Sequence, residues 1–141
     1  MKLYCMRHGE AVDAVQDPER PLTEAGSAGV KRLASHLKHI GVHFDHVMSS
    51  EVLRAQKTAE IMASQISPSL KIETMSSLTE NSECEGLLSD LLHWNDDTLL
   101  VGHLPMMDDL VSQLLTRTAG SLTLTFVPGT IVCLEKHQHI I

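Results

Sequence analysis

The chain has 141 residues, a formal net charge of −7, an apolar share of 43% and an aromatic share of 3%. These values describe one globular domain, and we expect a single domain over residues 1–141 with a core of ordinary size. The negative charge argues against a protein that binds nucleic acid or a membrane surface through a basic field. No run approaches the ~20 apolar residues of a membrane span.

Three widely spaced cysteines, Cys5, Cys84 and Cys133, form no paired motif, which argues against a zinc site and a disulfide framework. The apolar run at the N-terminus is too short for a signal peptide. We therefore expect a cytoplasmic protein with reduced thiols.

Segments with strand patterns alternate with segments with helix patterns. The predicted strands are Lys2–Met6, His46–Ser49, Lys71–Met75, Thr98–Val101 and Thr130–Leu134, with Leu122–Phe126 as an extra edge strand. Four helices are predicted. The first begins after an N-cap at Thr23 and ends at Gly41, and the second and third cover Glu51–Gln65 and Cys84–Leu92. The fourth begins at Pro105. This order predicts an α/β fold of three α/β/α layers around a mainly parallel sheet.

Arginine and histidine residues follow three of these strands. Arg7-His8-Gly9 comes after the first, Arg54 comes shortly after the second, and Gly102-His103 comes after Leu99–Val101. Ligands of open α/β sheets bind just beyond the carboxyl ends of strands. Two arginines and two histidines at that edge predict a pocket for a phosphoryl group.

The residue types suit phosphoryl transfer. Arg7 and Arg54 can each donate two parallel hydrogen bonds to phosphate oxygens, and Gly9 allows the backbone to approach closely. A neutral His8 can attack phosphorus to give a phosphohistidine, and positive neighbours keep it unprotonated. His103 would donate a hydrogen bond to the phosphoryl oxygens. We expect neither a metal nor a cofactor.

These motifs resemble the histidine phosphatase superfamily, which has the phosphoglycerate mutase-like fold. The resemblance covers nearly the whole chain and rests on Arg7-His8-Gly9, Pro21-Leu22-Thr23-Glu24-Ala25-Gly26, the segment from Ser49 to Thr58 with Arg54-Ala55, and Gly102-His103. It implies that His8 is phosphorylated and that Arg7, Arg54 and His103 bind the phosphoryl group. Leu78-Thr79-Glu80 resembles a segment whose glutamate is a general acid in many members, so Glu80 is the candidate acid.

Larger members of the superfamily carry a helical cap between the second arginine and the second histidine. Here only two helices, a strand and a loop fit between Arg54 and His103, so we expect a minimal cap and an open site. The chain is most similar to the compact SixA-type phosphohistidine phosphatases, which share a start like Arg7-His8-Gly9-Glu10-Ala11. The resemblance implies a role in signal transduction, with a phosphotransfer domain or a phosphotransferase-system protein as substrate.

Other functions stay open at this point. The main alternative is a phosphatase of a small phosphoester, for which Glu80 would matter more, because an alcohol leaves less readily than imidazole. A mutase is a weaker alternative, since it needs an enclosed site. A non-catalytic binding module is weaker still, because all four core residues are present.

Some polar residues have less specific interpretations. We interpret Ser49 and Ser50 as helix-capping residues in preference to pocket residues, and Glu10 or Asp13 as alternative acids or substrate contacts. The histidines of the segment 36–46 are expected to be solvated rather than to bind a metal, and those at 137 and 139 to lie in a frayed terminus.

Overall fold

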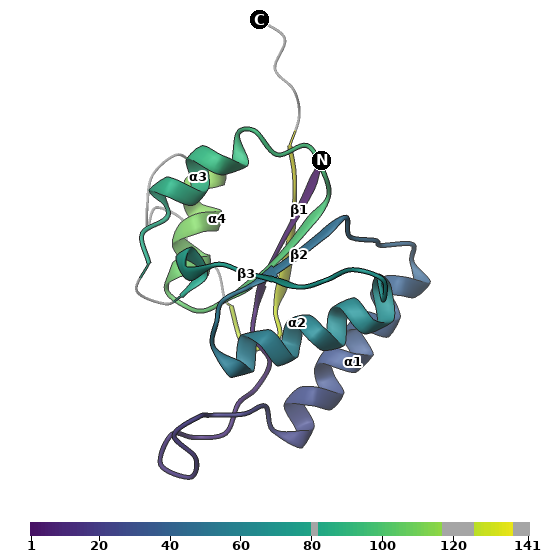
Figure 1. The fold of residues 1–141 in the computed structure, drawn as a ribbon, viewed down its shortest axis with the longest axis vertical. Coiled ribbons are helices and arrows are strands. Elements are labelled where there is room, and N and C mark those ends of the chain that lie inside the picture. The colour runs from purple at the N-terminus through teal and green to yellow at the C-terminus, as the bar shows by residue number, and fades with distance from the viewer. Residues whose placement is uncertain (80–81, 117–125, 137–141) are drawn as a thin grey trace, which may run out of the picture.

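The computed structural model describes residues 1–79, 82–116 and 126–136. The strands are β1 (Lys2–Arg7), β2 (His46–Ser49), β3 (Glu73–Thr74), β4 (Thr98–Gly102) and β5 (Ile131–Glu135) (Figure 1). The helices are α1 (Glu24–His39), α2 (Leu53–Ile66), α3 (Glu85–Leu91) and α4 (Met106–Thr116), with a short 3-10 helix, η1 (Ser76–Leu78). None of the helices in the described part of the chain is long and apolar enough to cross a membrane.

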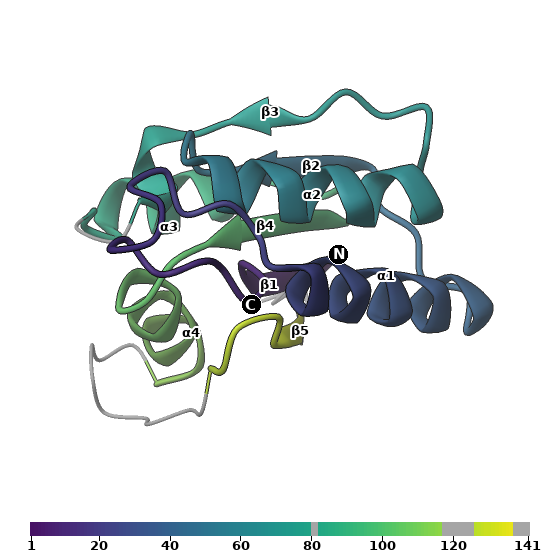
Figure 2. The ribbon, with the colours of Figure 1, turned by 90° about the horizontal axis from the view of Figure 1, so that it is seen from below.

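The described strands form one sheet in the order β3-β2-β4-β1-β5, which Figure 2 shows from below. Neighbouring strands are parallel except β5, which runs antiparallel to β1. Cys5 pairs with Leu100 of β4 on one side and with Val132 of β5 on the other. All five residues of β4 are buried, as expected for a central strand with helices on both faces.

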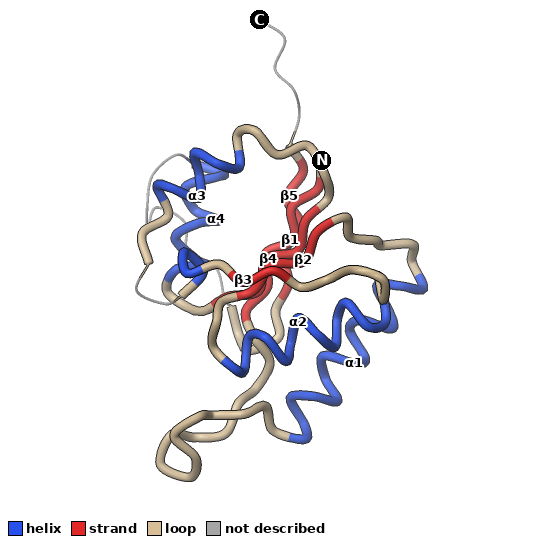
Figure 3. The backbone as a smooth tube through the Cα atoms, viewed as in Figure 1, coloured by secondary structure: helices blue, strands red, loops and turns tan. Residues whose placement is uncertain are grey.

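Helices cover both faces of the sheet, α1 and α2 on one and α3 and α4 on the other (Figure 3). Successive side chains of a strand point to opposite faces. Leu3 and Cys5 of β1 therefore join the core under α3 and α4, whereas Tyr4 and Met6 join the core under α1 and α2. This is the three-layer arrangement that the alternation of patterns predicts.

The ends of α1 follow the sequence signals. The Thr23 hydroxyl accepts a hydrogen bond of 2.8 Å from the Gly26 amide, which satisfies one of the free N–H groups of the first turn. Gly41, just beyond the helix, has a φ of 88°, a conformation that glycine adopts without a steric cost.

Three element predictions need comment. β3 is only two residues long, because this exposed edge strand pairs only with Met48 and Ser49 at the end of β2. α4 begins at Met106, and the Pro105 carbonyl accepts the hydrogen bond from the Asp109 amide at its start. The edge strand predicted at 122–126 lies outside the described residues, apart from Phe126, which is buried and in no strand.

Candidate active site

The register of the sheet brings three strand ends together. Arg7, the last residue of β1, pairs with Gly102 of β4, and Ser49 at the end of β2 pairs with Val101. The pairing continues one residue further, since the His8 amide donates to the Gly102 carbonyl (3.1 Å) and the Ser50 amide donates to the Val101 carbonyl (3.1 Å). His8, Ser50 and His103 therefore lie side by side at the carboxyl edge of the sheet.

His8 is held in a single tautomer. Its ring is 4% exposed, and Nδ1 lies 2.8 Å from the Gly9 carbonyl oxygen. Because a carbonyl oxygen only accepts, Nδ1 carries the hydrogen and Nε2 keeps its lone pair. Nε2 accepts a hydrogen bond of 3.3 Å from Nε of Arg54, in the first turn of α2. The ring nitrogen that carries no hydrogen therefore faces an arginine.

His103 faces His8, with the two ring centroids 5.1 Å apart and the ring planes inclined by 55°. It is 2% exposed, and its Nε2 lies 2.6 Å from the Ser50 hydroxyl. That hydroxyl also accepts a hydrogen bond from the Val52 amide (3.3 Å), and its own hydrogen can be donated to Nε2 of His103. In that tautomer Nδ1 of His103 carries the hydrogen, and this nitrogen has no partner among the described residues.

Both imidazoles are neutral at pH 7. The pKa of His8 is lowered from 6.5 to about 4, mainly by burial and also by His103, Arg54 and Arg7, while the Gly9 carbonyl opposes the shift. The pKa of His103 is likewise lowered to about 4, mainly by burial, with smaller effects of Arg54, Arg7 and Arg20. Loss of hydration and nearby positive charge both disfavour an imidazolium. A neutral His8 is the form that can act as a nucleophile.

Arg7 supplies further donors at the same edge. One terminal nitrogen donates to the Phe126 carbonyl at 2.8 Å, which fixes the guanidinium. Its Nε is buried without a hydrogen-bond partner among the described residues. Burial and the charge of Arg20 lower the pKa of Arg7. An unpaired buried donor is costly, so this atom is suited to an oxyanion.

Thr58 of α2 braces the loop that carries His8. Its hydroxyl accepts a hydrogen bond from the Gly9 amide (3.0 Å) and donates to the Arg54 carbonyl (2.8 Å). On the other side of the loop, a Cβ added at Gly9 would lie 2.8 Å from Val30 of α1. Glycine therefore lets the backbone after His8 fit tightly between α1 and α2.

Comparison with known proteins identifies the family. Residues 3–93, more than half of the chain, match the histidine phosphatase superfamily, branch 1. The chain belongs to this superfamily. Phosphohistidine phosphatase SixA of Escherichia coli (strain K12) is 33% identical over 120 residues, which cover 81% of this chain and 74% of that protein.

Solved structures show the same fold. A structure of the protein histidine phosphatase SixA complexed with tungstate matches with a TM-score of 0.80 and 30% identity, over 94% of this chain and 86% of the other. The alpha-ribazole phosphatase from Shigella flexneri matches in fold with a TM-score of 0.73 and 21% identity, over 98% and 92% of the two chains. The predicted phosphoglycerate mutase-like fold and the SixA resemblance are thus confirmed.

The structure brings together the four residues that the sequence predicts for a histidine phosphatase site. Arg7, His8, Arg54 and His103 meet at one edge, with Gly9 beside them. Glu80 lies outside the described residues. Leu78, two residues earlier, is buried, and its carbonyl oxygen would lie 2.9 Å from a Cβ added at Gly102.

Two predictions about other polar residues change. The interpretation of Ser49 and Ser50 as helix caps is wrong, because α2 has Val52 at its N-cap with no side-chain cap, and Ser50 contacts His103 instead. Glu10 accepts a hydrogen bond from the Thr23 hydroxyl, and Asp13 accepts one from the Val15 amide, so each carboxylate has a local structural partner.

Sequence reasoning missed Thr58 and Arg20 as site neighbours, although Thr58 belongs to the quoted superfamily motif.

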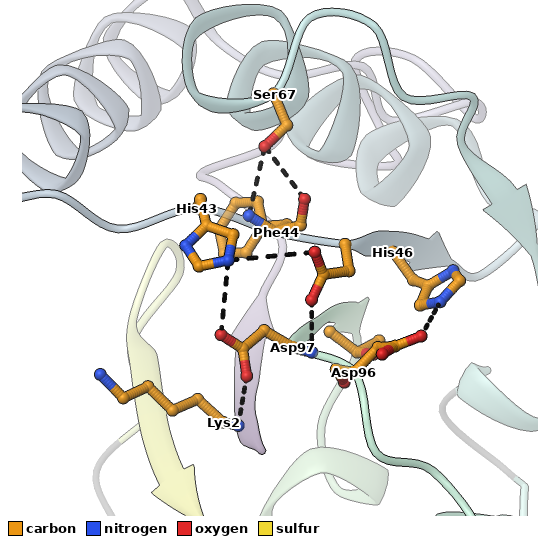
Figure 4. A network of polar contacts seen from close by, with 9 residues as sticks. Lys2, His43, Phe44, His46, Ser67, Asp96 and Asp97 are labelled. Carbon is orange, nitrogen blue, oxygen red and sulfur yellow. Dashed lines mark hydrogen bonds and ion pairs between the residues drawn. The ribbon is translucent and has the colours of Figure 1, made fainter.

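At the opposite end of the sheet, a polar network joins the starts of three strands (Figure 4). Asp97 accepts a hydrogen bond from the Lys2 amide (2.7 Å) and donates its own amide hydrogen to Asp45 (3.0 Å). Nε2 of His43 lies 3.9 Å from Asp45 and 3.7 Å from Asp97. These three side chains are a possible set of metal ligands, of which His43 and Asp45 are exposed, and the contacts of all three join them in a structural network.

Proposed function

We propose that this chain is a metal-independent phosphatase that works through a phosphohistidine formed on His8. The observation that carries the proposal is the state of His8. The ring is neutral at pH 7, its Nδ1 hydrogen is held by the Gly9 carbonyl, and its Nε2 lone pair faces a site with two arginines. Those arginines supply the positive charge that a phosphoryl group needs, so we expect a chelator to leave the activity unchanged.

The proposed reaction has two steps. First, Nε2 of His8 bonds to phosphorus while the bond from phosphorus to the leaving atom breaks, and the leaving group takes up a proton. The phosphorylated ring is positively charged, and the Gly9 carbonyl stabilises it by accepting the Nδ1 hydrogen. Second, a water oxygen bonds to phosphorus, the P–N bond breaks and a proton is released. The products are phosphate and neutral His8.

The remaining residues hold the phosphoryl group during both steps. His103 is suited to donate its Nδ1 hydrogen, which has no partner among the described residues, to a phosphoryl oxygen. Nε of Arg7 is a second unpaired buried donor, and Arg54 lies against the reacting nitrogen. Donors placed in advance lower the barrier, because they stabilise the charge of the transition state without having to reorganise.

We infer that the substrate is a phosphohistidine on a signalling or phosphotransfer protein. The similarity to SixA over most of both chains supports this substrate class. The chemistry agrees, because imidazole has a pKa of ~6.5 and leaves with little help from an acid. A site without a large cap would also admit a protein.

A small phosphoester is the second candidate. The two histidines are almost fully buried, at 4% and 2% exposure, and a small phosphate ester can enter such a site more easily than a folded protein can. The fold shared with an alpha-ribazole phosphatase fits this candidate equally well.

Paired hydrolysis rates separate the two candidates. We would measure turnover of a phosphohistidine-bearing phosphotransfer protein and of a panel of small phosphate monoesters, with and without EDTA, each with His8→Ala as the control. Fast turnover of the protein that depends on His8, with slow turnover of the monoesters, would support the proposal. The reverse preference would favour the metabolite phosphatase, and inactivity on both would favour a binding module.

Glu80→Gln tests the role of the candidate acid. We expect this variant to lose much more activity on an alcohol phosphate than on phosphohistidine, since an alcohol depends far more than imidazole on an acid that protonates it as it leaves. The measurement is kcat on both substrates, with Glu83→Gln as the matched control from the same segment. Equal losses on both substrates would contradict the prediction.

A further inference from the structure

The polar network of Figure 4 lies at the amino ends of the parallel strands, opposite the edge that carries the candidate active site. His43 and Asp45 belong to the segment that leads into β2, and Asp97 directly precedes β4. β2 and β4 pair in parallel with His46 opposite Thr98, so the residues just before these two also lie side by side. The fold therefore brings together an imidazole and two carboxylates that are far apart in the sequence.

Hydrogen bonds of the backbone hold this segment in place. The Ser67 hydroxyl, at the end of α2, accepts a hydrogen bond from the Phe44 amide and donates one to the Phe44 carbonyl, each of 3.2 Å. The Asp45 amide donates to the Asp97 carbonyl at 2.8 Å. Residues 43–45 are thus tied both to α2 and to the start of β4.

Each of the two carboxylates uses one oxygen for the backbone and turns the other toward His43. Oδ1 of Asp97 accepts the hydrogen bond from the Lys2 amide, and Oδ2 of Asp45 accepts the one from the Asp97 amide. The other oxygens, Oδ2 of Asp97 and Oδ1 of Asp45, lie 3.7 Å and 3.9 Å from Nε2 of His43. Among the described residues, no lysine or arginine forms an ion pair with either carboxylate.

The spacing of these three atoms is that of a gap between ligands. A hydrogen bond between nitrogen and oxygen spans about 2.7–3.2 Å, so Nε2 of His43 is too far from both oxygens to form one. Two ligands of one tetrahedral zinc ion, each about 2.0–2.2 Å from the metal, lie roughly 3.3–3.6 Å apart. The three atoms lie within 4.8 Å of one another, and His43 and Asp45 are exposed. Small side-chain rotations therefore suffice to bring them to this spacing.

We propose that His43, Asp45 and Asp97 bind a divalent metal ion, with Zn²⁺ as the best fit and a water as its fourth ligand. Imidazole and carboxylate both ligate zinc, and three protein ligands leave one tetrahedral position open. The backbone N–H groups that hold the two carboxylates are partners of the kind that orient the ligands of metal sites. The ion would join the starts of β2 and β4 and would neutralise negative charge in a protein of net charge −7.

This site is separate from the proposed reaction, because it lies at the opposite end of the sheet from His8. The ion would stabilise the fold and would take no part in phosphoryl transfer. The proposal therefore does not depend on the proposed function, and it agrees with a phosphatase that keeps its activity in a chelator.

Calorimetry of zinc binding tests the proposal without any turnover. We would treat the protein with EDTA, remove the chelator, and titrate zinc chloride into the wild type and into His43→Gln, Asp45→Asn and Asp97→Asn. A ligand should matter at least as much as the partner that orients it, whose loss costs about tenfold to a hundredfold in affinity, so we expect about a hundredfold weaker binding in each variant. Asparagine keeps a side-chain oxygen that can accept the backbone hydrogen bond, so the network should persist.

The chain offers matched controls. His46 and Asp96 are an exposed pair beside the proposed ligands, 3.2 Å apart, so His46→Gln and Asp96→Asn should bind zinc as the wild type does. His8→Ala should do so as well, which separates this site from the histidines of the active site. No zinc binding by the wild type, wild-type affinity in His43→Gln and Asp97→Asn, or a loss of binding in His8→Ala would overturn the proposal.

Thermal unfolding gives a second readout. An ion that binds only the folded state stabilises it, so zinc at a hundredfold excess over Kd should raise the Tm of the wild type by about 5 °C or more. The Tm of Asp97→Asn should not respond to the same zinc concentration. A wild-type Tm that zinc leaves unchanged, or an equal rise in Asp97→Asn, would contradict the proposed site.

Discussion

Ser50 illustrates how a single hydroxyl can set the state of a site histidine. It accepts a hydrogen bond from the Val52 amide and can donate its own hydrogen to Nε2 of His103. In the arrangement that we propose, Nδ1 of His103 is then the donor toward the phosphoryl position. A neutral imidazole has one donor and one acceptor, so fixing one nitrogen fixes the other.

We expect Ser50→Ala to lower kcat by roughly tenfold, about 1.4 kcal/mol in the barrier, because His103 loses its preferred tautomer. Ser49→Ala is the matched control, since Ser49 is equally buried and its hydroxyl contacts the Ser50 carbonyl instead of His103. Steady-state kinetics of the two variants on one substrate provides the measurement. Equal losses in both variants would show that the effect is only one of packing.

At the level of elements, the site depends on how α2 is joined to the end of β1. Thr58 lies one helical turn after Arg54 and connects the Arg54 carbonyl to the Gly9 amide. The same helix thus positions an arginine against Nε2 of His8 and holds the loop that carries His8. The small residues Ala55 and Ala59 are fully buried and let α2 pack closely on the sheet.

Replacing Thr58 by valine keeps the shape of the side chain but removes the hydroxyl. The buried Gly9 amide would then lack an acceptor, so we expect the free energy of unfolding to fall by about 1–3 kcal/mol. We also expect kcat to fall, because His8 moves relative to Arg54. Urea denaturation and kinetics measure the two effects. Unchanged stability together with unchanged kcat would contradict this account of the Gly9–Thr58 bond.

The sequence predicts elements better than it predicts the contacts between them. The strand ends that carry Arg7, His8 and His103 follow from local patterns, and parallel pairing brings them to one edge. The role of Ser50 does not follow from local pattern, because the partner of its hydroxyl is His103, 53 residues away in the chain. The conformation of Arg20 is equally hidden, since its positive φ and the effect of its charge on Arg7 arise only from the folded loop. Glu80 stays a prediction.

For the whole molecule, a net charge of −7 coexists with a positive site. Arg7 and Arg54 raise the local potential, and together with burial, which is the larger cause, they lower the pKa values of the two histidines to about 4. The concentration of positive charge at one edge explains how an acidic protein could attract a phosphorylated partner. Docking should therefore weaken as salt is raised.

The buried histidines predict acid sensitivity. Each has a pKa of about 4 in the folded state, below its ordinary value of 6.5, so the unfolded state binds more protons between these values. Their contribution to stability is complete above pH 6.5 and is lost as pH falls toward 4. Urea denaturation from pH 7.5 to 4.5 should show this decline, and His8→Gln should make it shallower. An identical slope in His8→Gln would contradict the assignment.

The central claim is that His8 carries the phosphoryl group. Rapid quenching of a phosphohistidine substrate with the enzyme, followed by mass spectrometry at alkaline pH, tests it most directly. We predict that the wild type gains one phosphoryl group on the peptide containing His8, that Arg32→Gln, on the exposed face of α1, behaves in the same way, and that His8→Ala gains none. Turnover by the wild type with phosphate on another residue, or full activity of His8→Ala, would contradict the account.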